Sequence, residues 1–165
     1  CCVDRTGNWT LLLAGTELPL ETVAVYDLRP CGGDVALWTA EGMSLYDRQG
    51  LLLSQLQLDG AEVRCWACGD FLAAAVLEDG AWRLRTLNCR GRTWESDPLP
   101  GKPDCLTVCD NSICVLDSSG ILVYDVHGTL RMRIDPGAPA ERLCPFPGGV
   151  LLSGGGEYQI RRLSN

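Results

Sequence analysis

A hairpin-like segment that occurs twice constrains the fold more than any other feature of this chain. Residues 35–50 read VALWTAEGMSLYDRQG, and residues 113–128 read ICVLDSSGILVYDVHG. Each copy is an apolar run, a polar turn ending in Gly, a second apolar run ending in Tyr-Asp, and another turn ending in Gly. A weaker copy covers residues 71–91. A regular repeat of this kind decides the architecture of a chain.

The glycine that closes the first turn of each copy marks the period. The runs between the turns are about five to seven residues long and rich in Val, Leu, Ile, Trp and Tyr, which is typical of hairpins in series. No stretch of ten or more residues carries a clean helical stripe, so ankyrin and tetratricopeptide repeats fit poorly. The marker recurs at intervals of 35 to 40 residues, at Gly7, Gly42, Gly80, Gly120 and Gly156.

Four strands fit into each period. In the best-defined copy they are expected near residues 62–67, 71–77, 81–87 and 92–96. Four short antiparallel strands repeated in this way form the blades of a β-propeller, so the sequence predicts an all-β fold with about four and a half blades. The whole chain, 1–165, is interpreted as one partial propeller. Its expected units are 1–20 (partial), 21–59, 61–100, 102–135 and 139–165 (partial).

The chain resembles a degenerate member of the WD-repeat type of propeller. In that family a Trp-Asp pair ends the third strand, and here Tyr46-Asp47 and Tyr124-Asp125 stand in that place. The other copies lack the pair, and no Gly-His opens a unit. Seven residues are therefore expected to build turns or blades: Tyr46, Asp47, Tyr124, Asp125, Gly42, Gly80 and Gly120.

About four and a half blades would leave exposed strand edges if the ring were not completed. Propellers close with between about four and eight blades, and open edges invite aggregation. The chain also begins with Cys1 rather than Met. We therefore expect it to be part of a longer polypeptide and of a larger ring, with other chain completing the propeller.

The composition excludes several classes of function. Apolar residues make up 46% of the chain and charged residues 21%, as in soluble globular domains. The longest apolar runs are of strand length, so no membrane insertion is expected. The net charge is −7, and the basic residues gather into nothing larger than short Arg pairs, which argues against direct binding of nucleic acid.

The ten cysteines allow several interpretations. Cys65 and Cys68 form a C-x-x-C pair, which is compatible with zinc or redox chemistry, and disulfides are a further alternative. The repeat favours buried structural thiols and a reducing compartment, with no metal and no cofactor. It aligns two sets of equivalent positions, Cys65, Cys105 and Cys144, and Cys31, Cys68 and Cys109.

No catalytic constellation is recognised. The only histidine, His127, lies in a turn without a nucleophile beside it, and the glycine-rich 153–156 segment lies between two expected strands. Asp and Glu side chains at turns of this kind fix hairpins by accepting backbone N–H groups. That role is expected for Asp34, Glu41, Asp47, Asp70, Asp79, Asp110, Asp117 and Asp125.

Five residues are candidates for a protein interface. Trp94 lies near an outermost strand, and interfaces favour Trp and Arg. Three consecutive leucines cannot all face one side of a strand. The candidates are Trp94, Leu51, Leu53, Arg90 and Arg92.

These features together predict a non-enzymatic protein-interaction scaffold. The resemblance implies a subunit of an intracellular complex, cytoplasmic or nuclear, of the trafficking, ubiquitin-ligase adaptor or genome-maintenance type. Its expected partners are other protein subunits, including the chain that completes the propeller. An extracellular or lumenal recognition propeller is the alternative, and a small-ligand-binding or enzymatic propeller is a further one.

Overall fold

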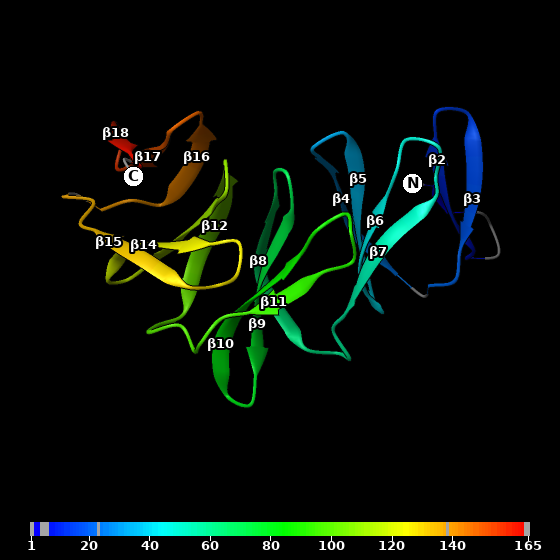
Figure 1. Ribbon diagram of the computed structural model, residues 1–165, viewed down its shortest axis with the longest axis horizontal. Coiled ribbons are helices and arrows are strands. Elements are labelled where there is room, and N and C mark those ends of the chain that lie inside the picture. Colours follow the sequence, from blue (N-terminus) through cyan, green and yellow to red (C-terminus); the bar gives the residue numbers. More distant parts are fainter. Residues whose placement is uncertain (1, 4–6, 23, 138, 164–165) are drawn as a thin grey trace. The chain divides into compact units, whose positions relative to one another are not determined.

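The chain is built from antiparallel β-strands. The computed structural model describes residues 2–3, 7–22, 24–137 and 139–163, and these residues form five sheets (Figure 1). No helix long and apolar enough to cross a membrane occurs among them. The chain divides into two compact units, Cys1–Gly60 with Leu87–Arg92, and Ala61–Thr86 with Thr93–Asn165, which are described separately.

The first unit contains two sheets. Strands β1 (Cys2–Val3), β2 (Trp9–Leu13) and β3 (Thr16–Leu20) form a three-stranded sheet in that order. The second sheet has four strands in sequential order, β4 (Val25–Cys31), β5 (Asp34–Thr39), β6 (Gly42–Tyr46) and β7 (Leu52–Gln57). Side chains that alternate along these strands supply the buried core, which includes Leu11, Leu37, Met43, Leu45 and Leu56.

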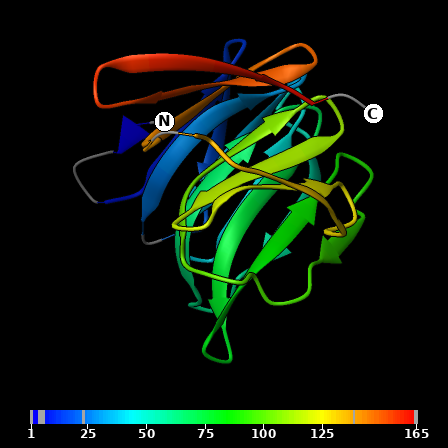
Figure 2. The ribbon, with the colours of Figure 1, turned by 90° about the vertical axis from the view of Figure 1, so that its left-hand side faces the viewer.

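The second unit contains three sheets, each with its strands in sequential order. The first comprises β8 (Glu62–Cys68), β9 (Leu72–Glu78), β10 (Ala81–Leu87) and β11 (Thr93–Glu95), where Leu87 already belongs to the first unit. The next comprises β12 (Pro103–Cys109), β13 (Ser112–Asp117), β14 (Gly120–Asp125) and β15 (Leu130–Ile134). The last comprises β16 (Arg142–Phe146), β17 (Gly149–Gly154) and β18 (Glu157–Arg162). Figure 2 views the ribbon from the side of β18.

The β12–β15 sheet is covered on both faces. β13 and β14 are rich in β-branched residues, which suit a pleated strand, and successive side chains point to opposite faces. One face packs with residues of β8, β9 and β10, and includes Ile113, Val115, Leu122 and Tyr124. The other packs with Val150 and Leu152 of β17, and includes Cys114, Leu116, Ile121 and Val123.

The turn between the third and fourth strands is built alike in all three four-stranded sheets. One side-chain oxygen accepts the N–H groups of the residues two and four positions further on, at 2.8–3.0 Å. The glycine three positions on donates its N–H to the carbonyl of the same residue, at 3.0 Å each time. The side-chain oxygen takes the place of water as acceptor for backbone N–H groups that have no partner in the hydrogen-bond ladder of the sheet. The acceptors are Asp47 Oδ1, Asn88 Oδ1 and Asp125 Oδ1.

Two glycines at the start of a third strand are required by backbone contact. Gly42 has φ 148° and Gly120 has φ 128°, a region closed to most L-residues. A Cβ on Gly42 would lie 2.2 Å from the carbonyl oxygen of Leu56, and one on Gly120 would lie 2.8 Å from that of Ile134. The repeated glycine therefore lets the fourth strand approach the third.

Candidate functional site

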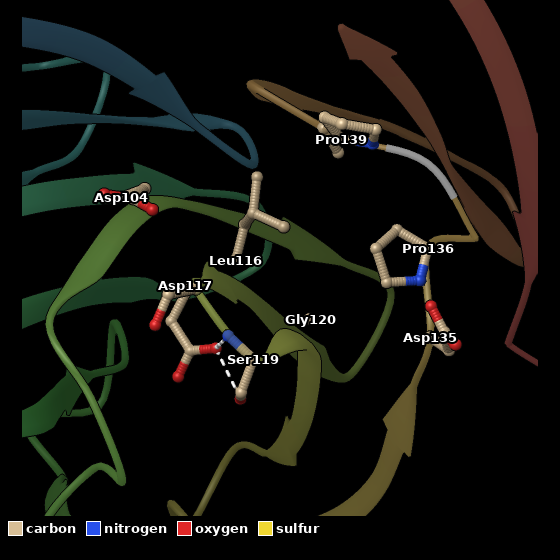
Figure 3. A pocket seen from close by; sticks show the side chains of 10 residues that line it. Asp104, Leu116, Asp117, Ser119, Gly120, Asp135, Pro136 and Pro139 are labelled. Carbon is tan, nitrogen blue, oxygen red and sulfur yellow. Dashed lines mark hydrogen bonds between the residues drawn. The ribbon is translucent and has the colours of Figure 1, made fainter.

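The candidate site is a pocket in the second unit, at the end of the β12–β15 sheet (Figure 3). In an antiparallel meander the turn between the second and third strands lies at the same end as the connection to the next sheet. The β13–β14 turn, with Asp117 and Ser119, therefore meets the connection from β15 to β16, with Asp135, Pro136 and Pro139. The cavity has a volume of about 380 Å³.

Asp117 is the most buried charged residue of this pocket, with 5% of its surface exposed. Its Oδ1 accepts hydrogen bonds from the N–H of Ser119 at 2.7 Å and from the Ser119 hydroxyl at 2.6 Å (Figure 3). Within the described part of the chain, no hydrogen bond ends on Asp117 Oδ2. The carboxylate is thus fixed by its own turn and keeps one oxygen available.

The pocket carries charge of one sign. Its charged lining residues are Asp104, Asp117 and Asp135, and no Lys, Arg or His of the described chain lines it. Apolar side chains, including Leu116 and Pro139, form the rest of the wall together with two serines. Across the described residues, no three His, Cys, Asp or Glu side chains are arranged so that they could hold a metal ion. The arrangement is suited to accepting a cationic group with an aliphatic stem.

A second surface feature is the outer face of the last sheet, which we name the open face: Cys144, Leu151, Tyr158 and Ile160. Tyr158 and Ile160 pair with Ser153 and Leu151 across β17 and β18. Tyr158 and Ile160 are equivalent by the repeat to Ile121 and Val123, which lie 37 residues earlier in the chain. Ile121 and Val123 pair with Leu116 and Cys114 in the same way across β13 and β14.

Exposure differs sharply between these equivalent positions. Ile121 and Val123 are 0% and 2% exposed because the next sheet covers them. Tyr158 and Ile160 are 74% and 62% exposed. A face that the repeat buries in one sheet is therefore uncovered in the next.

The predicted interface residues are distributed over both units. Trp94, on β11, is half-buried, and its ring lies 5.0 Å from the ring of His127 in an edge-on arrangement. Leu51 is 65% exposed just before β7, and Leu53 is half-buried within it. Arg90 and Arg92 are exposed in the β10–β11 turn. Trp94 belongs to the second unit and the other four to the first.

Asp125 anchors the turn that carries His127. Burial alone would raise the pKa of this carboxyl, but the N–H groups of Thr129 and His127 and the guanidinium of Arg131 outweigh it and lower the pKa. Asp125 also forms an ion pair with Arg131, so its carboxylate is fully engaged in contacts within the turn.

The cysteines occupy the equivalent positions that the repeat aligned. Cys65, Cys105 and Cys144 lie on β8, β12 and β16, the first strands of their sheets. Their expected burial is only partly observed, since the first two are half-buried and Cys144 is exposed on the open face. The side chains of Cys1 and Cys2 lie outside the described residues.

Burial makes three of the thiols unreactive. Cys109 Sγ donates to the carbonyl groups of Phe146 at 3.0 Å and Gly149 at 3.1 Å. Burial raises the pKa of the Cys114 thiol to about 12, and it also raises the pKa values of Cys105 and Cys109. A raised pKa keeps these groups protonated and unreactive near neutral pH.

Sequence reasoning missed two features of this site. Asp117 is expected from the sequence only as a turn residue, whereas it also lines the pocket with Asp104, at the start of β12, and Asp135, just after β15. Tyr158 and Ile160 are absent from the predicted interface, although their 37-residue offset from two buried residues is readable in the repeat.

Comparison with known proteins identifies the fold. No protein-family model and no curated protein sequence matches the chain. Solved structures do: BamB from Moraxella catarrhalis (TM-score 0.58, 14% identity, 86% of this chain and 51% of that one) and the Pan2 WD40 domain of Neurospora crassa (0.55, 11%, 88% and 50%). The computationally designed Ika4 protein is also similar (0.58, 18%, 92% and 96%).

These likenesses, together with the serial four-stranded sheets, show that the chain is made of β-propeller blades. The all-β prediction with about four and a half blades is confirmed, by three four-stranded and two three-stranded sheets in the described residues. The chain spans about half the length of BamB and of the Pan2 domain.

Proposed function

We propose that this chain is a non-enzymatic protein-interaction module, a propeller subunit of an intracellular multiprotein complex. A partner chain covers the open face of its last sheet. The observation that carries this proposal is the exposure of Tyr158 and Ile160 at positions whose equivalents, Ile121 and Val123, are buried.

The energetics favour occupation of this face. Burying one large apolar side chain is worth roughly 1.5–3 kcal/mol, and the open face presents several side by side. Among the described strands, β18 is also at the edge of its sheet, whereas its equivalent β14 is paired with β15. An edge strand beside an exposed apolar face suits a partner that brings further β-structure.

The proposed cellular setting rests on the thiols and on the WD-repeat resemblance. Cys89, Cys105, Cys109, Cys114 and Cys144 are free, and oxidising compartments convert many such thiols to disulfides. The resemblance favours a cytoplasmic or nuclear complex of the trafficking, ubiquitin-ligase or genome-maintenance type.

Affinity purification of the tagged full-length protein, followed by mass spectrometry, tests the interface. We expect Ile160→Asp to remove at least one partner that the wild-type protein retains, because a charge on the open face opposes burial. Leu51→Asp is the comparison variant, since Leu51 is equally exposed but belongs to the rival interface expected from the sequence, in the first unit.

A photo-crosslinking residue at position 158 provides the second measurement. It should link the same partner that Ile160→Asp loses. An unchanged set of partners in Ile160→Asp would contradict the proposal, and loss in Leu51→Asp alone would move the interface to the β6–β7 turn.

A further inference from the structure

We propose that the pocket at Asp117 binds an arginine or lysine side chain from a partner protein. This site is distinct from the open face, since it lies at the end of the β12–β15 sheet. The charge of the pocket, its shape and an available acceptor all favour a basic peptide side chain.

The charge of the pocket selects for a cation. Asp104, Asp117 and Asp135 line it, and no basic residue of the described chain does so. Arg161 lies near the rim, but its guanidinium donates to the Pro136 carbonyl and to Gln159 Oε1, both at 2.7 Å. That arginine is therefore occupied in holding the rim, and it does not neutralise the carboxylates of the lining.

Asp117 supplies the acceptor. Only 5% of its surface is exposed, and both bonds from Ser119 end on Oδ1, which fixes the carboxylate while Oδ2 accepts no hydrogen bond within the described chain. A partly desolvated carboxylate forms stronger hydrogen bonds with a cationic donor than an exposed one does. A guanidinium or ammonium group would complete this arrangement.

The walls suit the stem of a long basic side chain. Leu116, Pro136, Pro139 and Ala140 line the cavity, and proline rings hold their shape without losing rotamer freedom on binding. Arg and Lys bury their methylene groups along such surfaces while the charged end reaches a polar partner. A volume of about 380 Å³ admits a side chain and its flanking backbone but is at the small end for drug-sized ligands.

The rim is fixed by its own contacts. Asp135 Oδ1 accepts the N–H of Gly137 at 2.8 Å, and a Cβ on Gly120 would lie 3.3 Å from Pro136. Residues 135–137 are therefore held against the β13–β14 turn on one side of the pocket. Little ordering is left to be done when a ligand binds, which favours affinity.

NMR titration of the full-length protein with acetyl-Gly-Arg-Gly-amide and acetyl-Gly-Lys-Gly-amide tests the proposal. Saturable shifts are expected in the amides of residues 117–120 and in those of Asp135 and Gly137. The citrulline analogue, which keeps the shape but not the charge, should cause no saturable shift. Higher salt should weaken binding of the basic peptides.

Asp117→Asn is the decisive variant because Asn can still accept the Ser119 bonds, as Asn88 does in its own turn. It should weaken peptide binding about tenfold or more, the usual loss when a charged acceptor becomes neutral. Asp79→Asn is the matched control, an exposed aspartate in the β9–β10 turn outside the pocket, and it should bind normally.

If Asp117→Asn does not fold, Asp135→Asn provides the test instead. Asp135 is exposed, so its substitution should leave the fold intact, and it should also weaken peptide binding. Equal shifts with citrulline, shifts confined to other turns, or full binding by folded Asp117→Asn would each overturn the proposal. Failure of the open-face experiment would leave these results unaffected.

Discussion

At the scale of single residues, Gly42 and Gly120 show that the repeat preserves a backbone contact that only glycine allows. Each lies where the third strand begins, with the carbonyl of the neighbouring fourth strand closer than any Cβ allows. The sequence marks the same place in the third blade with Gly80, but there φ is 77° and a Cβ would meet no atom within 4 Å. The same residue type thus serves two physical requirements.

Alanine substitutions separate these requirements. Gly120→Ala should lower the free energy of unfolding by about 3 kcal/mol or more, because it adds a backbone clash to a forbidden φ. Gly80→Ala should cost about 1 kcal/mol, the strain of a left-handed alanine with room around it. Urea denaturation of both variants measures the difference, and equal losses would refute the role given to the Ile134 carbonyl.

At the scale of elements, the turn from third to fourth strand is the most regular part of the chain. Two blades use Asp and one uses Asn, with the same pattern of accepted N–H groups. The Tyr-Asp pair of the sequence is therefore one version of a broader pattern, Asp or Asn followed by Gly three residues later. The copy at Asn88 is hard to recognise in the sequence because Leu87 replaces the tyrosine.

Because Asn88 already fills this turn position in one blade, substitutions of Asp47 can test whether the side-chain oxygen or its charge stabilises the turn. Asp47→Ala should lower the free energy of unfolding by about 1–2 kcal/mol, because two turn N–H groups lose their acceptor. Asp47→Asn should cost much less, since an amide oxygen makes the same bonds at Asn88. Thermal unfolding followed by circular dichroism compares the two, and a loss as large in Asn as in Ala would contradict this account of the turn.

At the scale of the whole molecule, periodicity predicted the architecture better than it predicted the surfaces. Alternation and turn residues are local, so strands such as β13 and β14 could be located from the sequence. Exposure depends on which sheet packs next, and nothing within β16 distinguishes Cys144 from its half-buried equivalents. The pocket is lined by Asp104 at the start of β12, Asp117 at the end of β13 and Asp135 after β15, and only the folded chain places them around one cavity.

The thiols offer a test of the proposed compartment. Protein purified without reductant and labelled with a thiol reagent after denaturation should carry label on Cys89, Cys105, Cys109, Cys114 and Cys144, as located by peptide mapping. Labelling before denaturation should favour Cys89 and Cys144, the two exposed ones. Absence of label from most of the five in denatured protein would instead support an extracellular or lumenal propeller.

The open face has a consequence for how cells must handle this protein. If a partner chain covers this face as proposed, Tyr158 and Ile160 stay in contact with water until it docks, so newly made copies in excess would be held by chaperones or degraded. Its steady-state level should then follow the supply of its partner rather than the strength of its own expression. Halving the partner's gene dosage would lower this protein as well, while its messenger RNA stayed constant.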